Sequence, residues 1–431
     1  MNRLQTKYLI IGSGLSGLSA AYHVEDDYIL TESTDSVGGT AGTLNYKNFK
    51  LDNAVHILYF KNKEILDWIC NTLKVSLLEK IRENSIWIEN NYIRFPIQYH
   101  LADLPLLSRF YSFTSICKTL NFKKKNSFYK NFEEYSLRVF GNYLTDVFIR
   151  PYNEKLFGIQ LADMTTEWMG DYVPEYSKAK MILSITKLMN SKYGRNSKFY
   201  YPIDGGISTI AKRICEKLKL PPHQNYSLLK VFLDRKTAVF SNGVEINYKY
   251  LINTIALNIF LEKIDDLPDN ILNCIGLMKS NSTTILHILV KGNVNHNYYH
   301  WVYVPSKEIP FYRITFPGNI NPVNCPKGFS AITLEFGGDV YKNDIIAISS
   351  IRALERMGIL NESIIDIDLC WRLLDCGYVI YDQNRDRMLK TIFSFLQNYQ
   401  VWSIGRYGSW EYSNMEDAII HGKKVAEQLK I

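Results

Sequence analysis

The hydrophobic pattern at the start of the chain predicts a strand, a helix and a second strand. An apolar run ends at Ile11, glycines follow at positions 12, 14 and 17, and helical spacing then leads to a second run, Tyr28–Leu30, that closes on Glu32. The first glycine permits a tight strand-to-helix turn, the second lets the backbone approach a pyrophosphate, and the third lets helix and strand pack closely. The pattern therefore predicts a dinucleotide-binding unit.

The rest of the chain alternates between helical and strand-like spacing. Residues 61–198 are helical in period, apart from a hairpin predicted at 85–96. Alternating apolar runs between residues 284 and 336 predict an antiparallel sheet. We expect an α/β protein with a Rossmann-like dinucleotide-binding domain of residues 1–60, 199–265 and 395–431, an interleaved helical substrate subdomain of residues 61–198, and an antiparallel sheet substrate domain of residues 266–394.

The composition is that of an ordinary globular protein. The chain has 431 residues, of which 46% are hydrophobic and 22% charged, enough for two or three packed units. Its net charge of +7 fits an anionic substrate, and because Lys and Arg are dispersed, we expect no nucleic-acid partner. Seven scattered cysteines without a CxxC pair, and a start without a signal peptide, predict a cytoplasmic protein. The eight histidines lie far apart, so we expect no metal site.

One segment qualifies this picture. Residues 101–126 are apolar and aromatic and then strongly basic, which allows weak contact with a membrane surface. The alternative is a helical subdomain with a solvated tip at Lys123–Lys125, and we favour this alternative over membrane contact.

Further glycines and acids extend the dinucleotide signal. Glu32 lies 18 residues after Gly14, where a carboxylate accepts from ribose hydroxyls and repels the 2′-phosphate of NADP. A second glycine pair follows at positions 38 and 39, and a strand near the C-terminus runs into Gly405–Arg406 and a final helix. The predicted cofactor-binding residues are Gly12, Gly14, Leu15, Ser16, Gly17, Glu32, Ser33, Gly38, Gly39, Thr40, Val231, Gly405, Arg406, Asn414, Met415 and Ala418.

The order GxGxxGLxxA, Glu, GG resembles the superfamily of FAD enzymes that contains amine oxidases, protoporphyrinogen oxidases, phytoene desaturases and UDP-galactopyranose mutases. The resemblance implies the FAD-binding (GR2-type) form of the Rossmann-like fold and FAD as cofactor. It places the adenosine on Glu32 and the diphosphate over Gly12–Gly17. It also implies that the Gly405–Arg406 segment returns to the flavin, with the N-terminus of the last helix near the isoalloxazine or the diphosphate.

Interior motifs resemble the UDP-galactopyranose mutase-like branch in order along the chain. The matching stretches are Leu51–Ile57, Arg94–Gln98, Phe148–Gly158, Tyr200–Gly206, Pro310–Ile314 and Tyr378–Asp382. The resemblance implies catalytic roles for His56, Tyr312, Arg313 and Tyr378, and substrate binding by Tyr152, Phe157, Lys279 and Tyr381. Packing or a surface ion pair is the alternative for these residues. Tyr378 and Tyr381 are interpreted as lying in one strand.

Departures from this branch leave the reaction open. Ile159 stands where the mutases have an arginine for the substrate diphosphate, and Ser413 aligns with a tyrosine, although Tyr412 is adjacent. The first hypothesis is a pyranose–furanose mutase acting on a nucleotide-sugar in surface-polysaccharide biosynthesis, in which the resemblance implies reduced flavin N5 as nucleophile. The second is an FAD-dependent oxidoreductase that removes hydride from a C–N or C–C bond. A non-enzymatic flavoprotein is the third.

Overall fold

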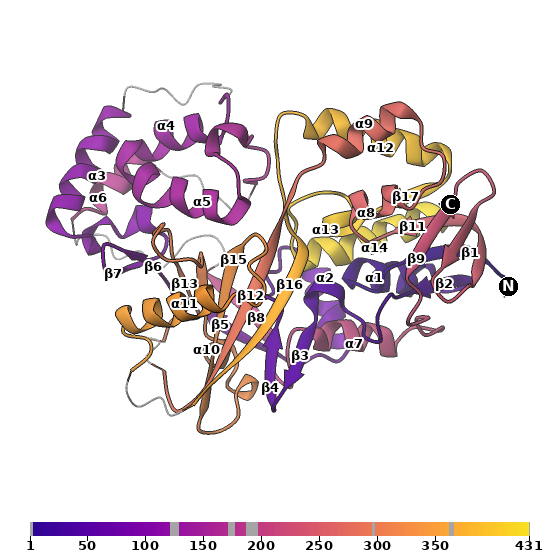
Figure 1. The fold of residues 1–431 in the computed structure, drawn as a ribbon, viewed down its shortest axis with the longest axis horizontal. Helices are drawn as coiled ribbons and strands as arrows, with labels where there is room; N and C mark the ends of the chain where they lie inside the picture. The colour runs from indigo at the N-terminus through magenta and orange to yellow at the C-terminus, as the bar shows by residue number, and fades with distance from the viewer. Residues whose placement is uncertain are drawn as a thin grey trace.

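Two β-sheets and a helical lobe frame the molecule (Figure 1). The computed structural model describes residues 3–120, 129–170, 177–186, 197–294, 298–361 and 366–430. Lys123–Lys125, predicted as a solvated tip, lie outside these residues. In the view of Figure 1 both chain ends lie on the right with the first sheet, and the helical lobe lies at the upper left.

The first sheet has the strand order β2-β1-β11-β10-β9, with β17 also paired to β11. Its strands are β1 (Arg3–Ile11), β2 (Tyr28–Thr31), β9 (Leu228–Phe232), β10 (Thr237–Phe240), β11 (Glu245–Asn253) and β17 (Val401–Ser403). β1 pairs in parallel with β2 and β11, and β11 pairs in parallel with β17. Segments from both ends and the middle of the chain therefore share this sheet.

Helices cover both faces of the first sheet, because its central strands are apolar on both sides. Tyr8 and Ile10 of β1 face one apolar cluster, and Leu9 and Ile11 face another. The first cluster includes residues of α1 (Leu15–Val24), α7 (Ser208–Glu216) and α14 (Met415–Lys430). The second includes residues of α8 (Leu257–Glu262), α9 (Asp269–Leu277) and α12 (Arg385–Asn398). The short helix α13 (Gly405–Gly408) connects β17 toward α14.

The second sheet has the order β16-β12-β15-β14-β13-β6-β7. Its strands are β6 (Asn84–Ile88), β7 (Asn91–Arg94), β12 (Ser280–Lys291), β13 (Trp301–Tyr303), β14 (Arg313–Thr315), β15 (Phe329–Gly337) and β16 (Ile367–Val379). The strands predicted between residues 284 and 336 pair antiparallel, as expected. The predicted hairpin β6–β7 joins the same sheet through a parallel pairing of β6 with β13. β16 also ends at Val379, so Tyr381 follows the strand that was expected to contain it.

Smaller elements complete the frame. Two further ribbons are β3 (Thr43–Tyr46) with β4 (Phe49–Asp52), and β5 (Leu77–Ile81) with β8 (Lys198–Pro202). On the second sheet lie α10 (Pro317–Ile320) and α11 (Asp344–Arg356), and α2 (Lys63–Asp67) precedes β5. The helical lobe contains α3 (Leu106–Lys118), α4 (Phe132–Leu144), α5 (Arg150–Phe157) and α6 (Lys178–Leu183). Among the described residues, no helix combines the length and the apolar character that crossing a membrane requires.

Candidate functional site

A cavity of about 810 Å³ joins the glycine turn of the first sheet to the second sheet and the helical lobe. Its lining includes Gly12, Arg313 and Phe132, which come from these three parts of the molecule. The volume lies in the range of sites that hold cofactors and small ligands.

The glycine turn forms one end of this cavity. Gly12 has a φ of 96°, which L-residues rarely adopt, and a Cβ on Gly17 would lie 1.9 Å from the carbonyl oxygen of Gly12. A Cβ on Gly14 would meet no atom of the chain within 4 Å, although Gly14 lines the cavity. Gly12 and Gly17 thus serve the fold, whereas the open side of Gly14 fits the close approach of a ligand.

The second glycine pair lies against the first. The Gly38 N–H donates to the Ser13 carbonyl oxygen at 2.9 Å, and Gly14 and Gly38 form an isolated parallel bridge. Gly38, Gly39 and Thr40 line the cavity together with the glycine turn. Two loops that are separate in sequence therefore form one backbone cradle.

Glu32 lies at the end of β2 and lines the cavity. One carboxylate oxygen accepts from the Ser13 N–H at 3.1 Å and the Ser13 hydroxyl at 2.6 Å. The other accepts from the Ser33 hydroxyl at 3.2 Å and from the N–H and hydroxyl of Thr34, both at 3.0 Å. A carboxylate offers about four lone-pair sites, so a ribose hydroxyl would replace or share one of these donors.

A buried charge cluster forms the opposite end. β13, β14 and β15 pair so that Tyr303, Arg313 and Glu335 lie in one row across the sheet. The Arg313 Nε donates to Glu335 Oε1 at 2.7 Å, and its Nη2 donates to Glu335 Oε2 and to the Tyr378 hydroxyl, the latter at 3.4 Å. The Tyr312 hydroxyl donates to Glu335 at 3.0 Å. Glu335 is fully buried, so this pair is fixed in place.

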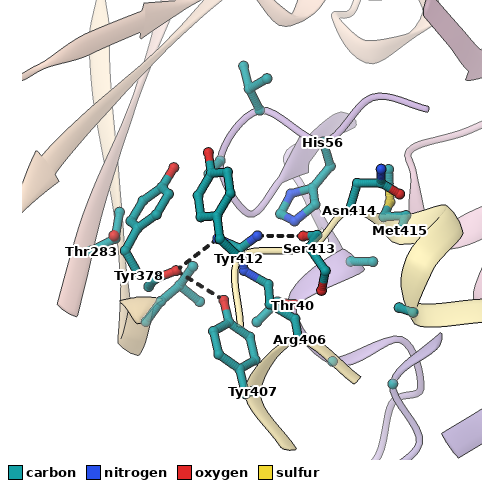
Figure 2. A pocket seen from close by; sticks show the side chains of 18 of the residues that line it. Thr40, His56, Thr283, Tyr378, Arg406, Tyr407, Tyr412, Ser413, Asn414 and Met415 are labelled. Carbon is teal, nitrogen blue, oxygen red and sulfur yellow. Dashed lines mark hydrogen bonds between the residues drawn. The ribbon is translucent and has the colours of Figure 1, made fainter. Parts of the chain in front are cut away.

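His56 lies between the two ends, on the loop after β4. Burial, with a smaller contribution from Arg406, lowers the pKa of His56 to about 4, so its imidazole is neutral at pH 7. Its Nδ1 is buried and has no hydrogen-bond partner among the described residues. Ala54, two residues earlier, has a φ of 63°, a left-handed conformation that is uncommon outside glycine. Figure 2 shows His56 beside Asn414 and Ser413.

The C-terminal segment supplies the adjoining wall (Figure 2). The Arg406 Nη1 donates to the Ser413 carbonyl oxygen at 2.5 Å, and its Nη2 donates to the Gly377 carbonyl oxygen at 3.5 Å. The rings of Tyr378 and Tyr412 are stacked with centroids 5.8 Å apart, and the Arg406 guanidinium lies 4.7 Å from the Tyr412 centroid. Arg406 therefore holds this loop against the end of β16.

An aromatic wall comes from the helical lobe. Phe132, Phe148, Tyr152 and Trp168 line the cavity. The rings of Phe132 and Trp168 meet edge to face at 5.0 Å, and burial raises the pKa of Tyr152 well above its usual value. The Trp168 Nε1 is buried without a partner among the described residues. The wall can therefore contact a flat ring and donate a hydrogen bond to it.

Most of the predicted site residues line this cavity. Those that do are His56, Tyr152, Arg313, Tyr378, Gly12, Gly14, Leu15, Ser16, Glu32, Ser33, Gly38, Gly39, Thr40, Arg406, Asn414, Met415 and Ala418. Their roles toward ligands stay predictions.

The other predicted residues lie outside the lining. Tyr312 supports Glu335, and Phe157 packs between Trp168 and Tyr378. Lys279 pairs with Asp382 at 2.9 Å, and the Tyr381 hydroxyl accepts from the Tyr412 N–H. Three cofactor-side residues have backbone or packing roles in the structure: Gly17, Val231 and Gly405.

Several lining residues lack a clear signal in the sequence. Arg82 follows β5 and lines the cavity, with its guanidinium 5.1 Å from the Phe95 ring centroid. No ion pair among the described residues involves Arg82. Glu335 and Tyr59 also line the cavity. The alternation of β15 could have placed Glu335 on one sheet face, but only strand pairing shows that this face meets Arg313.

Comparison with known proteins agrees with this arrangement. A family model described as an NAD(P)-binding Rossmann-like domain matches residues 10–69. A crystal structure of reduced UDP-galactopyranose mutase superposes with a TM-score of 0.93 at 25% identity, covering 99% of this chain and 94% of that chain. The chain has the fold of the FAD-dependent amine-oxidase-like superfamily.

Two more distant structures share this fold. A protein assigned as a protoporphyrinogen oxidase from Exiguobacterium sp. gives a TM-score of 0.74 at 15% identity, covering 100% of this chain and 98% of that chain. Wild-type putrescine oxidase bound to putrescine gives 0.64 at 12% identity, covering 99% of each chain. The likeness of these two structures shows the fold alone. The FAD predicted from the sequence is confirmed by the comparison with UDP-galactopyranose mutase at 25% identity.

The residues of the cavity fit FAD. The open side of Gly14 offers space beside a backbone cradle, and the Ser413 hydroxyl and His56 Nδ1 are buried polar atoms without partners among the described residues. Both atoms belong to residues that line the cavity. Buried polar atoms of this kind need a partner, and a ring with carbonyl and N–H groups supplies one.

Proposed function

We propose that this protein is an FAD-dependent enzyme that acts on a nucleotide-activated sugar as a pyranose–furanose mutase. The observation that carries the proposal is one cavity that joins the dinucleotide cradle to the Arg313–Tyr378 cluster and the aromatic wall. The likeness to UDP-galactopyranose mutase over 99% of the chain supports it. With it we propose a cytoplasmic role in surface-polysaccharide biosynthesis.

The chain's own residues suit a diphosphate that links a base to a sugar. The Nε and Nη2 of Arg313 face Glu335 and Tyr378, which leaves Nη1 for a ligand. The Arg82 guanidinium adds a positive charge that no described carboxylate pairs with. Guanidinium and phenol donors bind phosphate oxygens well in a partly desolvated site. The aromatic wall suits a base.

Reduced FAD, when bound, supplies a nucleophilic ring nitrogen for exchange at the anomeric carbon. Beside the flavin, neutral His56 offers Nδ1 as a hydrogen-bonding atom rather than a charge. Arg406 fixes the loop that carries Ser413 through its bond to the Ser413 carbonyl oxygen. Together these groups orient a substrate and keep water from it.

The test uses the FAD-loaded protein, reduced anaerobically with dithionite, with a panel of UDP-, dTDP-, GDP- and CDP-sugars. We expect a furanose product from one of them with the reduced protein and none with the oxidised protein. Tyr378→Phe should slow turnover, and Tyr341→Phe, at an exposed tyrosine, should not. The proposal fails if the loaded, reduced protein converts none of these sugars and binds none of them.

An oxidoreductase is the second candidate, and the position of Ile159 favours it. Ile159 packs against the hydrophobic core, where the mutases place an arginine for the diphosphate. An enzyme that removes hydride from a C–N or C–C bond does not need that cation. In this case the substrate alone, without dithionite, would bleach the flavin under anaerobic conditions.

A further inference from the structure

Helix α3 presents its apolar residues to the outside. Its buried positions Ser108, Ser112 and Ile116 recur every four residues and face the protein. Its large apolar side chains are exposed: Leu106 by 79%, Leu107 by 62%, Phe110 by 59%, Tyr111 by 46% and Phe113 by 41%. A helix on a protein surface in water normally has the reverse arrangement.

Polar contacts fix the inner face of α3. The Ser108 hydroxyl donates to Glu89 Oε2 at 2.6 Å, and the Tyr143 N–H donates to the Ser115 hydroxyl at 3.0 Å. Gly141 of α4 approaches so closely that a Cβ there would lie 2.4 Å from the Ser115 hydroxyl. The helix therefore cannot roll to bury its outer side chains without breaking these contacts.

The neighbouring helix α6 extends the exposed surface. α3 and α6 pack together, and Leu183 of α6 is 51% exposed. We call Leu106, Leu107, Phe110, Tyr111, Phe113 and Leu183 the α3 face. In Figure 1 both helices lie at the left edge of the molecule, away from the first sheet. An apolar patch of this kind marks an interaction site.

The charges of these two helices have one sign. α3 (LLSRFYSFTSICK) and α6 (KAKMIL) contain no acidic residue. Their basic residues are Arg109, Lys118, Lys178 and Lys180. Of the acids that border α3, Asp103 is paired with Arg94 at 2.7 Å, and Glu89 accepts from the hydroxyls of Ser108 and Tyr143.

We propose that the α3 face docks on an anionic lipid surface. Exposed apolar side chains on helices whose charged residues are all basic are a pattern that binds to the boundary between lipid headgroups and acyl chains. Anionic headgroups would attract the exposed residues Lys118 and Lys180, whereas a second copy of the chain would bring two basic faces together. The site is separate from the cavity, so the proposal does not depend on the reaction.

The experiment measures co-sedimentation of the FAD-loaded full chain with vesicles. We expect binding to vesicles of phosphatidylcholine and phosphatidylglycerol, weakened by added salt, and little binding to phosphatidylcholine alone. The double variant Leu107→Ser, Phe110→Ser should bind the mixed vesicles at least about tenfold more weakly, because it removes apolar area that would enter the lipid. Lys118→Glu should weaken binding to the anionic vesicles.

The matched control is Leu229→Ser, because Leu229 is 52% exposed on β9, outside the helical lobe. It should bind vesicles like the parent, and the FAD content of all variants should be unchanged. Three results would overturn the proposal: no binding of the parent to anionic vesicles, equal binding of the double variant, or a double variant that only lowers the molar mass in solution. The last result would assign the α3 face to a second copy of the chain.

Discussion

The two ends of the cavity are built in different ways. The dinucleotide end consists of backbone from residues 12–16 and 38–40, with the side chain of Glu32 held by Ser13, Ser33 and Thr34. The opposite end, which we propose holds the substrate and call the substrate end, consists of side chains spread along the chain from Arg82 to Tyr412. Its charges are set by pairs such as Arg313 with Glu335, which are 22 residues apart.

This difference decides how each end tolerates change. A backbone cradle depends on the absence of side chains, so an added methyl group disrupts it through sterics. A side-chain cluster depends on matched charges and donors, so a substitution disrupts it by leaving a partner unsatisfied. The following predictions separate these two kinds of failure.

The largest effect is expected at Gly17. Gly17→Ala places a Cβ 1.9 Å from the Gly12 carbonyl oxygen, which forces α1 away from β1. We expect loss of FAD and a destabilisation of about 3 kcal/mol or more, measured by urea unfolding and flavin absorbance. Gly14→Ala is the matched control: its Cβ meets no chain atom, so it should fold normally and lose only FAD affinity. Equal stability loss in both variants would contradict this account.

The next effect is expected at the buried ion pair. Glu335→Gln leaves Arg313 without its carboxylate in a buried position, which should lower the free energy of unfolding by about 3–5 kcal/mol. Glu79→Gln, at the exposed pair with Lys198, should cost less than about 1 kcal/mol. The double variant Arg313→Met, Glu335→Leu should regain part of the stability, because it leaves no buried charge. If it is no more stable than Glu335→Gln, the unpaired charge of Arg313 is not the cause of the loss.

A smaller loss of stability is expected on substitution of Lys155, which connects α5 to the segment between β13 and β14. Its Nζ lies 2.7–3.0 Å from the carbonyl oxygens of Val304, Ser306, Ile309 and Phe311, which share its three N–H donors. Burial lowers the pKa of Lys155 to about 7, while the four carbonyls favour its charged form.

Lys155→Met should cost about 2–3 kcal/mol in urea unfolding, because it leaves several carbonyls without a donor. Lys80→Met removes a bond to a single carbonyl, that of Asn319, and should cost about 1 kcal/mol or less. FAD content should stay normal in both variants. A loss of FAD in Lys155→Met would show that the two ends are coupled.

The same contrast explains what could be predicted from the sequence. The dinucleotide end is a local motif, so spacing between glycines and an acid is enough to find it. The fold class and the shared first sheet also follow, because apolar strand patterns survive long insertions. The interior motifs identified His56, Arg313 and Tyr378 as candidate site residues, and all three line one cavity.

The rest depends on contacts that no local pattern records. Arg82 lines the cavity, and its backbone N–H donates to the Ser197 carbonyl oxygen, while the Glu83 N–H donates to His300 Nδ1. These contacts hold the short link between β5 and β6 at both sides. Phe157 and Tyr381 have the right residue types for a ligand site, but packing and a backbone contact use their side chains.

A binding effect without a stability effect is expected at Arg82. Arg82→Gln should weaken UDP binding roughly tenfold and leave uridine binding unchanged, because a guanidinium–phosphate contact is lost. Arg94→Gln, at an arginine of β7 that is paired with Asp103, should change neither affinity. Titration calorimetry on the FAD-loaded protein measures both ligands. If UDP and uridine weaken equally, Arg82 does not contact the phosphates.

The smallest effect is expected from His56 at neutral pH. Its pKa of about 4 lies below the ordinary value of 6.5, so the unfolded state binds more protons between these values. Stability from His56 is therefore complete above about pH 6.5 and is lost as the pH falls toward 4.

Asp52, whose pKa burial raises to about 6, titrates in the same pH range with the opposite effect on stability, so the measurement must compare variant with parent. In thermal unfolding, the His56→Asn variant should lose less stability than the parent on acidification. The difference in stability between variant and parent should stay constant between about pH 7 and 8. A difference that changes within that neutral range would mean that His56 is charged in the folded protein, and the cavity would then carry one more positive charge than its geometry indicates.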